Sequence, residues 1–139
     1  MKPVLLDTGV IVAWLDRREQ FHARSAEIVG RLAAPIVTCE AVITEACYLL
    51  RKIPGACETV MANIEAGTFH VPLRLTESGG EVRRILRKYR DRNIDLADAC
   101  LICLADALET GDILTLDSDF KFYRWSRNNA FRLLIPFAQ

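Results

Sequence analysis

The sequence predicts an α/β fold in which a parallel central sheet of about four to five strands is flanked by helices. Short apolar segments alternate along the chain with longer segments of helical period, and this alternation is typical of parallel sheets. The chain has 139 residues, enough for one domain that buries about 68–70% of its unfolded surface. No repeat, low-complexity segment or long linker divides it, so a single domain is expected over residues 1–139.

The N-terminal third is expected to begin with a buried strand over residues 3–6, because apolar strand-forming residues follow one another there. A short helix is expected over residues 10–16. A second helical pattern covers residues 21–34, and the next strand is expected over residues 35–38, beginning at a proline.

The middle of the chain is expected to be mostly helical. Residues 40–52 have the period of a helix, with apolar side chains at Val42, Ile43, Ala46, Leu49 and Leu50. Pro54 suits the first turn of a further helix that ends near Gly67, and residues 69–71 predict a third strand. A long charged helix is expected from Thr76 to about Arg90, with Asn93 closing it.

The C-terminal third contains the most apolar helical pattern, over residues 95–109, with Gly111 at the expected cap position. A strand is expected over residues 113–116, leading into Asp117. A last strand is expected over residues 132–135.

The composition is typical of a soluble globular protein, with 51% hydrophobic and 26% charged residues. No apolar run approaches the ~18 residues that a membrane span needs, and Met1-Lys2-Pro3 begins no signal peptide, so a cytoplasmic protein is expected. The 18 basic and 18 acidic residues balance, which argues against coating of nucleic acid by bulk charge. The five cysteines are expected to be small buried hydrophobic residues in a reducing compartment.

Two aspartates stand where predicted strands end. Asp7 follows the first strand, and Asp117 follows the strand at 113–116. Ligands of open parallel sheets bind outside the carboxyl ends of the strands. An aspartate in this place often caps the next helix instead, and that alternative stays open for both residues. Asp119, two residues further on, is more typical of a cap than of a ligand.

Two more carboxylates are expected near the starts of helices. Glu45 has no basic side chain among its helical neighbours, which are Ala41, Val42, Tyr48 and Leu49. An unpaired carboxylate on an apolar flank is costly when it is buried, although Glu45 at the edge of a solvated face is the alternative. Asp98 lies in a first helical turn, where an acid also favours the helix dipole, so its position alone leaves its role open.

These four carboxylates can converge on one edge of the sheet. Carboxylates that converge repel one another strongly at low dielectric, and a divalent cation between them relieves the repulsion. Carboxylates together with water suit Mg²⁺ or Mn²⁺. The sequence therefore indicates a site for one of these ions.

Four segments resemble, in order and in spacing, the acidic motifs of the PIN domain. The closest resemblance is to the VapC-type toxins of bacterial and archaeal toxin–antitoxin pairs. The segments are Val4-Leu5-Leu6-Asp7-Thr8, Thr44-Glu45-Ala46, Asp95-Leu96-Ala97-Asp98-Ala99 and Leu114-Thr115-Leu116-Asp117-Ser118-Asp119-Phe120. Each motif is weak alone, whereas four in order over nearly the whole chain are fairly specific.

The resemblance implies an α/β/α sandwich and a metal-dependent endoribonuclease that hydrolyses RNA with an activated water. The acidic quartet matches Asp7, Glu45, Asp98 and Asp117. Of these, Asp7, Asp98 and Asp117 are expected to bind Mg²⁺, with Mn²⁺ as a substitute, and Glu45 to orient the water. Thr8 and Thr115 match hydroxyls that orient the quartet, whereas Asp119 matches a position that is acidic in many members and not in others.

The resemblance also implies partners, namely an RNA substrate, a second copy of the chain in a homodimer, and an inhibitory antitoxin. Arg83, Arg87 and Arg90 recur at helical spacing and are candidates for binding RNA phosphates, with a solvated helix face as the alternative. Apolar residues of the helix at 54–67 are candidates for the dimer contact, unless they pack inside the monomer; they are Val60, Met61 and Ile64. A C-terminal aromatic cluster could stack on RNA bases, although core packing is more typical of Phe120, Phe122, Tyr123 and Trp125.

Other functions explain less of the chain. Asp7-Thr8-Gly9 is also the signature of aspartic proteases, whose chemistry needs two such aspartates on β-rich lobes. A catalytically silent RNA-binding module would have lost acidic residues, and all four are present. A PIN nuclease that processes RNA without acting as a toxin remains the main alternative.

Overall fold

The central sheet has five short strands, all parallel. The computed structural model describes residues 1–136, and the strand order is β3-β2-β1-β4-β7. The strands are β1 (Val4–Leu6), β2 (Ile36–Val37), β3 (Phe69–His70), β4 (Asp112–Leu114) and β7 (Arg132–Leu133). Every neighbouring pair is parallel, so the predicted parallel sheet of four to five strands is confirmed. Residues 137–139 of the expected domain lie outside the described residues.

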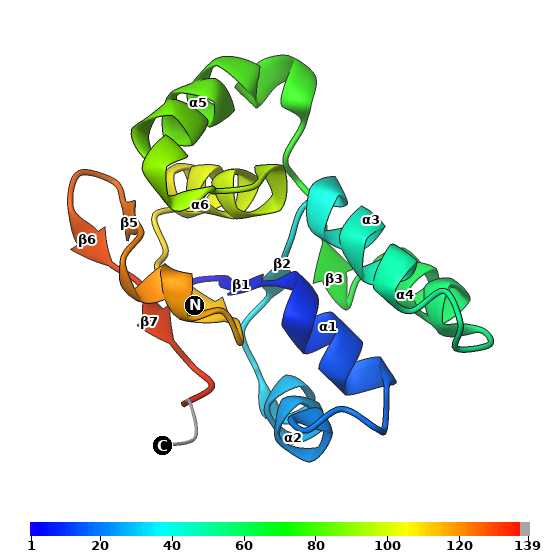
Figure 1. Cartoon of the computed structure of the whole chain (residues 1–139). Coiled ribbons are helices and arrows are strands. Elements are labelled where there is room, and N and C mark those ends of the chain that lie inside the picture. Colours follow the sequence, from blue (N-terminus) through cyan, green and yellow to red (C-terminus); the bar gives the residue numbers. More distant parts are fainter. Residues whose placement is uncertain (137–139) are drawn as a thin grey trace.

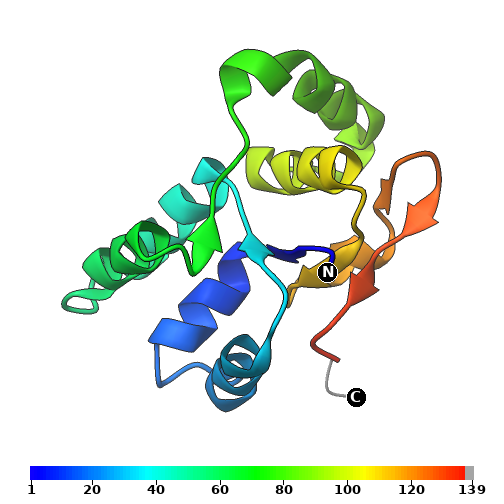
Figure 2. The same ribbon diagram turned by 180° about the vertical axis from the view of Figure 1, so that it is seen from behind.

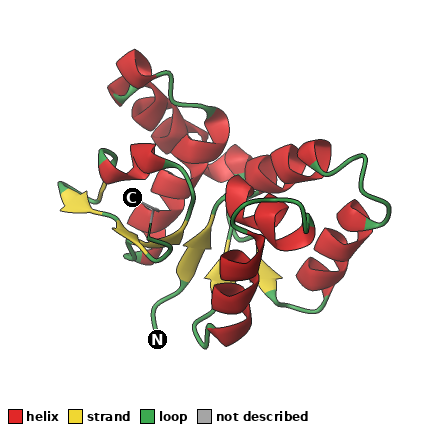
Figure 3. Cartoon of the chain, turned by 60° about the horizontal axis from the view of Figure 1, so that its bottom comes forward, coloured by secondary structure: helices red, strands yellow, loops and turns green. Residues whose placement is uncertain are grey.

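Helices lie on both sides of this sheet. Residues 1–136 form six α-helices, which are α1 (Thr8–Leu15), α2 (His22–Arg31), α3 (Glu40–Leu49), α4 (Ala56–Glu65), α5 (Leu75–Lys88) and α6 (Leu96–Leu108). Figures 1 and 2 show α5 and α6 on one side of the sheet and α1 and α2 on the other. Figure 3 shows the short strands surrounded by helices. The predicted α/β/α layering is therefore confirmed.

The centre of the core is β1. Its three residues are all buried, and Leu5 pairs with Val37 of β2 on one side and with Ile113 of β4 on the other. A strand covered on both faces has a continuous apolar run in its sequence, and this is why the apolar residues of 3–6 predict a buried strand. No helix within residues 1–136 is both long and apolar enough to cross a membrane.

Several helix ends differ from the expected ones. Helices α2 and α3 end at Arg31 and Leu49, short of the expected ends at residues 34 and 52. The prediction that Pro54 lies in the first turn of α4 is wrong. Gly55 precedes Ala56 with φ of 76°, a left-handed conformation that stops a helix from including Pro54.

Gly111 does not cap α6, because the left-handed residue at the end of that helix is Glu109, with φ of 52°. Gly111 is required for a different reason. A Cβ atom added to it would lie 2.0 Å from Nε1 of Trp125, so only glycine leaves room for the indole. The strand expected at 113–116 ends at Leu114, which leaves Thr115 and Leu116 in the loop before Asp117.

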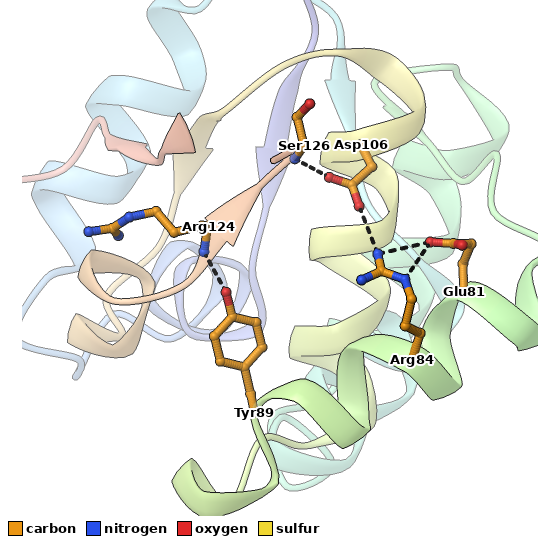
Figure 4. Close-up of polar contacts among 6 residues, drawn as sticks. All are labelled: Glu81, Arg84, Tyr89, Asp106, Arg124 and Ser126. Carbon is orange, nitrogen blue, oxygen red and sulfur yellow. Dashed lines mark hydrogen bonds and ion pairs between the residues drawn. The ribbon is translucent and has the colours of Figure 1, made fainter. Parts of the chain in front are cut away.

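A second, two-stranded sheet was not predicted. It is the antiparallel hairpin of β5 (Arg124–Trp125) and β6 (Asn129–Ala130). Figure 4 shows how it is held, since the backbone N–H of Ser126 donates to the carboxylate of Asp106 on α6 and the backbone N–H of Arg124 donates to the hydroxyl of Tyr89 at 3.0 Å. Arg84 of α5 lies 4.0 Å from the same Asp106 carboxylate. The hairpin is therefore fixed to both α5 and α6.

The apolar residues of α4 and the cysteines each divide into buried and exposed members. Val60 is fully buried, so it packs inside the monomer, whereas Met61 is 44% exposed and Ile64 is partly buried. Burial of the cysteines is confirmed for Cys39, Cys100 and Cys103, but Cys57 is exposed and Cys47 is only half-buried.

Candidate metal centre

Three carboxylates meet at the carboxyl edge of the sheet. Asp7 follows β1, Asp117 follows β4, and Asp98 lies in the first turn of α6. One carboxylate oxygen from each lies within 4.8 Å of the other two. The parallel pairing of β1 and β4 brings Asp7 and Asp117 to the same edge, as expected from the strand ends, and the start of α6 adds Asp98. We call these three residues the acidic triad.

Hydrogen bonds fix the position of Asp7 on both of its oxygens. The hydroxyl of Thr115 donates to Oδ2 at 2.7 Å, and the backbone N–H of Thr8 donates to Oδ1 at 2.8 Å. Thr115 also accepts from the backbone N–H of Asp117 at 3.0 Å. Thr115 therefore connects two members of the acidic triad.

Asp7 and Asp117 are both helix caps and members of the acidic triad. Asp7 is the N-cap of α1, and Asp117 is the N-cap of the 3₁₀ helix η2 (Ser118–Lys121), where it accepts from the backbone N–H of Asp119 at 2.9 Å. Each capping bond uses only one carboxylate oxygen; the second oxygen of Asp7 accepts from the hydroxyl of Thr115. The capping alternative is thus correct without excluding a ligand role.

Asp98 is held by a residue that the sequence did not mark as part of the site. The hydroxyl of Tyr123 donates to Oδ2 of Asp98 at 3.3 Å, and Tyr123 is itself fully buried. In sequence Tyr123 is one of several clustered aromatic residues, and nothing there distinguishes it. Its ring packs edge-on against Phe120 at 5.1 Å between centroids, so core packing is correct for Tyr123 and Phe120.

Burial raises the pKa values of the acidic triad. Asp7 is 6% exposed and Asp98 is 8% exposed. Loss of hydration raises the pKa of Asp7 to about 6, and the charges of Asp117 and Glu45 add to the rise against the opposing hydrogen bonds from Thr115 and Thr8. Burial, followed by the charges of Asp95, Asp7 and Asp117, raises the pKa of Asp98 to about 8. Burial also raises the pKa of Asp117.

Glu45 is not buried, so the expectation of a carboxylate on a buried apolar flank is wrong for it. The neighbouring Tyr48 and Leu49 on α3 are themselves 62% and 54% exposed, so that flank of the helix faces outward. Glu45 nevertheless lines the same pocket of about 440 Å³ as the three triad carboxylates. It lies beside the acidic triad without belonging to it.

Thr8 offers an unused polar atom in this pocket. Its side chain is 95% buried, and its hydroxyl oxygen has no hydrogen-bond partner among residues 1–136. Buried hydroxyls are normally satisfied, so this one indicates a missing neighbour such as a water or a water-coordinated ion. The three clustered carboxylates and the hydroxyl of Thr8 together fit a divalent cation with oxygen ligands.

Asp119 lies outside the acidic triad. Its carboxylate lies 3.9 Å from the guanidinium of Arg92, and that guanidinium lies 3.9 Å from the ring centroid of Phe122. Phe122 is 54% exposed, unlike the buried Phe120 and Tyr123. The sequence did not identify Arg92 as the basic residue at this edge of the site.

The three arginines predicted to bind RNA are all exposed. Arg83 and Arg87 lie on α5, and Arg90 begins the 3₁₀ helix η1 (Arg90–Arg92). Their exposure fits both phosphate binding and a solvated helix face. Arg84, between them in sequence, instead pairs with Glu81 at 3.0 Å.

The sequence is similar to known proteins over most of its length. The PIN domain family matches residues 4–125, which include all three residues of the acidic triad and Glu45. The chain is also 31% identical over 116 residues to the protein named Ribonuclease VapC26 of Mycobacterium tuberculosis, covering 82% of this chain and 86% of that protein. The aspartic protease interpretation of residues 7–9 is therefore wrong.

Proposed function

Because this chain belongs to the PIN domain family, we propose that it is a Mg²⁺-dependent endoribonuclease and the toxin of a type II toxin–antitoxin pair. The observation that supports this most is the acidic triad: one oxygen from each residue lies within 4.8 Å of the other two, with Asp7 and Asp98 buried and Asp117 half-buried. Repulsion among these carboxylates destabilises the folded state when no cation is bound, and a bound metal ion would relieve that repulsion. The likeness to a protein named a ribonuclease supports RNA as the substrate.

Asp7, Asp98 and Asp117 are the proposed metal ligands. When bound, Mg²⁺ supplies Lewis-acid stabilisation of the phosphate charge and lowers the pKa of a coordinated water. Thr115 keeps Asp7 oriented through its 2.7 Å hydrogen bond, and Tyr123 does the same for Asp98. Glu45, exposed in the same pocket, is proposed to orient the attacking water and accept its proton.

Cleavage of RNA is expected to require a divalent cation. Purified protein should cut a single-stranded RNA in Mg²⁺ or Mn²⁺, and excess EDTA should abolish cutting because the carboxylates alone cannot stabilise charge on the phosphate. Gel analysis of labelled RNA measures the rate, and adding back Mg²⁺ should restore it. Ca²⁺ added at the same ionic strength controls for salt. Undiminished cleavage in EDTA would contradict the proposed metal mechanism.

The arginines Arg83, Arg87 and Arg90 are proposed to bind RNA phosphates. Changing all three to glutamate should weaken RNA binding and lower the slope of log Kd against log salt by about 2, since each phosphate contact with a single strand contributes about 0.7. Fluorescence anisotropy at several salt concentrations measures the slope. A matched control changes Arg17, Arg24 and Arg31, near α1 and α2 on the other side of the sheet. Equal slopes in the two triple variants would favour the solvated-face alternative.

The chain is further proposed to act in the cytoplasm as a homodimer. Large exposed apolar side chains of three helices, Tyr48, Leu75 and Leu96, line a groove of about 640 Å³. This groove also shares Glu45 and Asp95 with the acidic pocket, so a second copy seated there would lie beside the metal centre. Light scattering should give twice the mass of one chain, and Leu75→Glu should give a monomer. A monomeric wild type would contradict the proposal.

The antitoxin is proposed to block the acidic pocket directly. A segment that inserts an arginine can replace the charge of the metal and donate to the oxygens of the triad in a fork. The exposed entrance at Glu45 and Leu49 leaves room for such a segment.

A further inference from the structure

Two cysteines on neighbouring helices lie in contact away from the metal centre. Cys47 is in the last turn of α3, and Cys57 is in the first turn of α4. Their Sγ atoms are 2.9 Å apart, with the thiol of Cys57 donating to Cys47. We infer that Cys47 and Cys57 form a reversible disulfide when the protein meets a peroxide, and that this bond joins α3 to α4.

The exposure of the thiols determines which of them react. Cys57 is the exposed cysteine, Cys47 is half-buried, and the other three are buried: Cys39, Cys100 and Cys103. A peroxide in solution therefore meets Cys57 first, and oxidation of the thiol follows thiolate character and exposure. Cys47 lies in the position of a resolving thiol.

The sulfur atoms of Cys47 and Cys57 need to move little to form the bond. A disulfide has an S–S length of about 2.05 Å, so the two sulfur atoms must approach by roughly 0.9 Å. Rotation about the side-chain bonds supplies such a change. The six residues of 50–55 between the helices already form a closed turn, in which the N–H of Ile53 donates to the carbonyl of Leu50 at 2.9 Å.

The chemistry balances with one peroxide for two thiols. The thiolate of Cys57 attacks one oxygen of hydrogen peroxide and breaks the O–O bond, which gives a sulfenic acid and, after protonation, one water. The sulfur of Cys47 then attacks the sulfur of Cys57, loses its proton and displaces the hydroxyl as a second water. Two thiols are oxidised, the peroxide is reduced, and a dithiol reductant reverses the bond by exchange.

The bond has a structural effect that does not depend on nuclease activity. It closes a short loop between α3 and α4 and so restricts the unfolded chain. It also fixes the end of α3 whose residues Glu45 and Leu49 line the acidic pocket. The inference therefore stands or falls separately from the proposed function.

The test uses the full chain, first reduced and then treated with a small excess of hydrogen peroxide. The oxidised protein should lose the mass of two hydrogen atoms, and peptide mapping should link the peptides of Cys47 and Cys57. Its Tm should rise by roughly 5–10 °C and return after dithiothreitol. The variant Cys47→Ser should instead accumulate a sulfenic acid at Cys57 that a 1,3-dione reagent traps.

Two further cysteine variants serve as controls. Cys103→Ser, a change at a buried thiol, should form the same bond as wild type, and Cys57→Ser should form none. If Cys57 of the peroxide-treated wild type still reacts fully with iodoacetamide, the inference is wrong. A bond between the Cys57 residues of two chains, or between Cys57 and a third cysteine, would also overturn it.

Discussion

Replacing Asp98 with asparagine is expected to lower the rate of RNA cleavage by about three orders of magnitude or more, with the fold intact. Asparagine keeps the shape of the side chain but removes one of the three charges that would hold the metal. The hydroxyl of Tyr123 can still donate to the amide oxygen, so packing around the residue is preserved. Cleavage rates at saturating Mg²⁺ measure the loss of activity. Thermal unfolding of the same samples tests whether the fold is intact.

Asp91→Asn provides the matched control, because Asp91 is an exposed aspartate on η1, outside the acidic triad. It should cut at the rate of the wild type. Asp7→Asn should behave like Asp98→Asn. Near wild-type turnover of either triad variant would show that the assigned metal site is wrong.

The same variant tests the biological role in cells. Expression of the wild type in bacteria should stop growth, whereas expression of Asp98→Asn should not. Co-expression of the proposed antitoxin, a small protein encoded by the neighbouring gene, should restore growth to cells that express the wild type. If the active enzyme is harmless at high expression, the chain is better explained as a PIN nuclease of RNA maturation.

Without metal, the protein should lose stability as the pH rises from about 4 to about 8. The folded state raises the pKa of Asp7 to about 6 and that of Asp98 to about 8, from a usual value of 3.8. Between these values the folded chain binds more protons than the unfolded chain, so the free energy of unfolding falls with increasing pH. Thermal unfolding in EDTA, measured at intervals of pH, follows this loss.

Mg²⁺ should reverse the loss, and most strongly at the upper end of this range, where the carboxylates of the triad are ionised in the folded state. A ligand at 100 times its Kd stabilises by about 2.7 kcal/mol, which is several degrees in Tm. Asp98→Asn should be more stable than the metal-free wild type at pH 8 and should respond less to Mg²⁺. Stability of the metal-free wild type that stays level or increases over this range would contradict the pKa values.

Local sequence patterns were sufficient for the sheet and for two members of the triad. Buried strands such as Val4–Leu6 appear as apolar runs, and the aspartates after them are in the place where parallel sheets bind ligands. Asp98 needed the family resemblance, because an aspartate in a first helical turn has ordinary reasons to be there. Its neighbour Asp95 is such an ordinary cap, accepting from the N–H of Asp98 at 2.8 Å.

Features that depend on distant contacts were not predictable. For Glu45 the sequence left open a buried apolar flank or the edge of a solvated face, and only the packing of α3 determines that Tyr48 and Leu49 face outward. Gly111 resembled a helix cap, and its true reason is the indole of Trp125, which comes from a hairpin with no strong strand pattern. The contact between Tyr123 and Asp98 likewise joins residues 25 positions apart.

The order of the strands has a consequence during translation. Strand β4 inserts beside β1, the first strand to be made, and the loop after β4 brings Thr115 to Asp7 and adds Asp117 to the triad. While the residues after 110 are still inside the ribosome, the emerged part of the chain lacks Asp117. It also lacks Thr115, whose hydroxyl orients Asp7. If the chain is the proposed ribonuclease, this order of assembly keeps it from attacking the message that encodes it until most of that message has been translated.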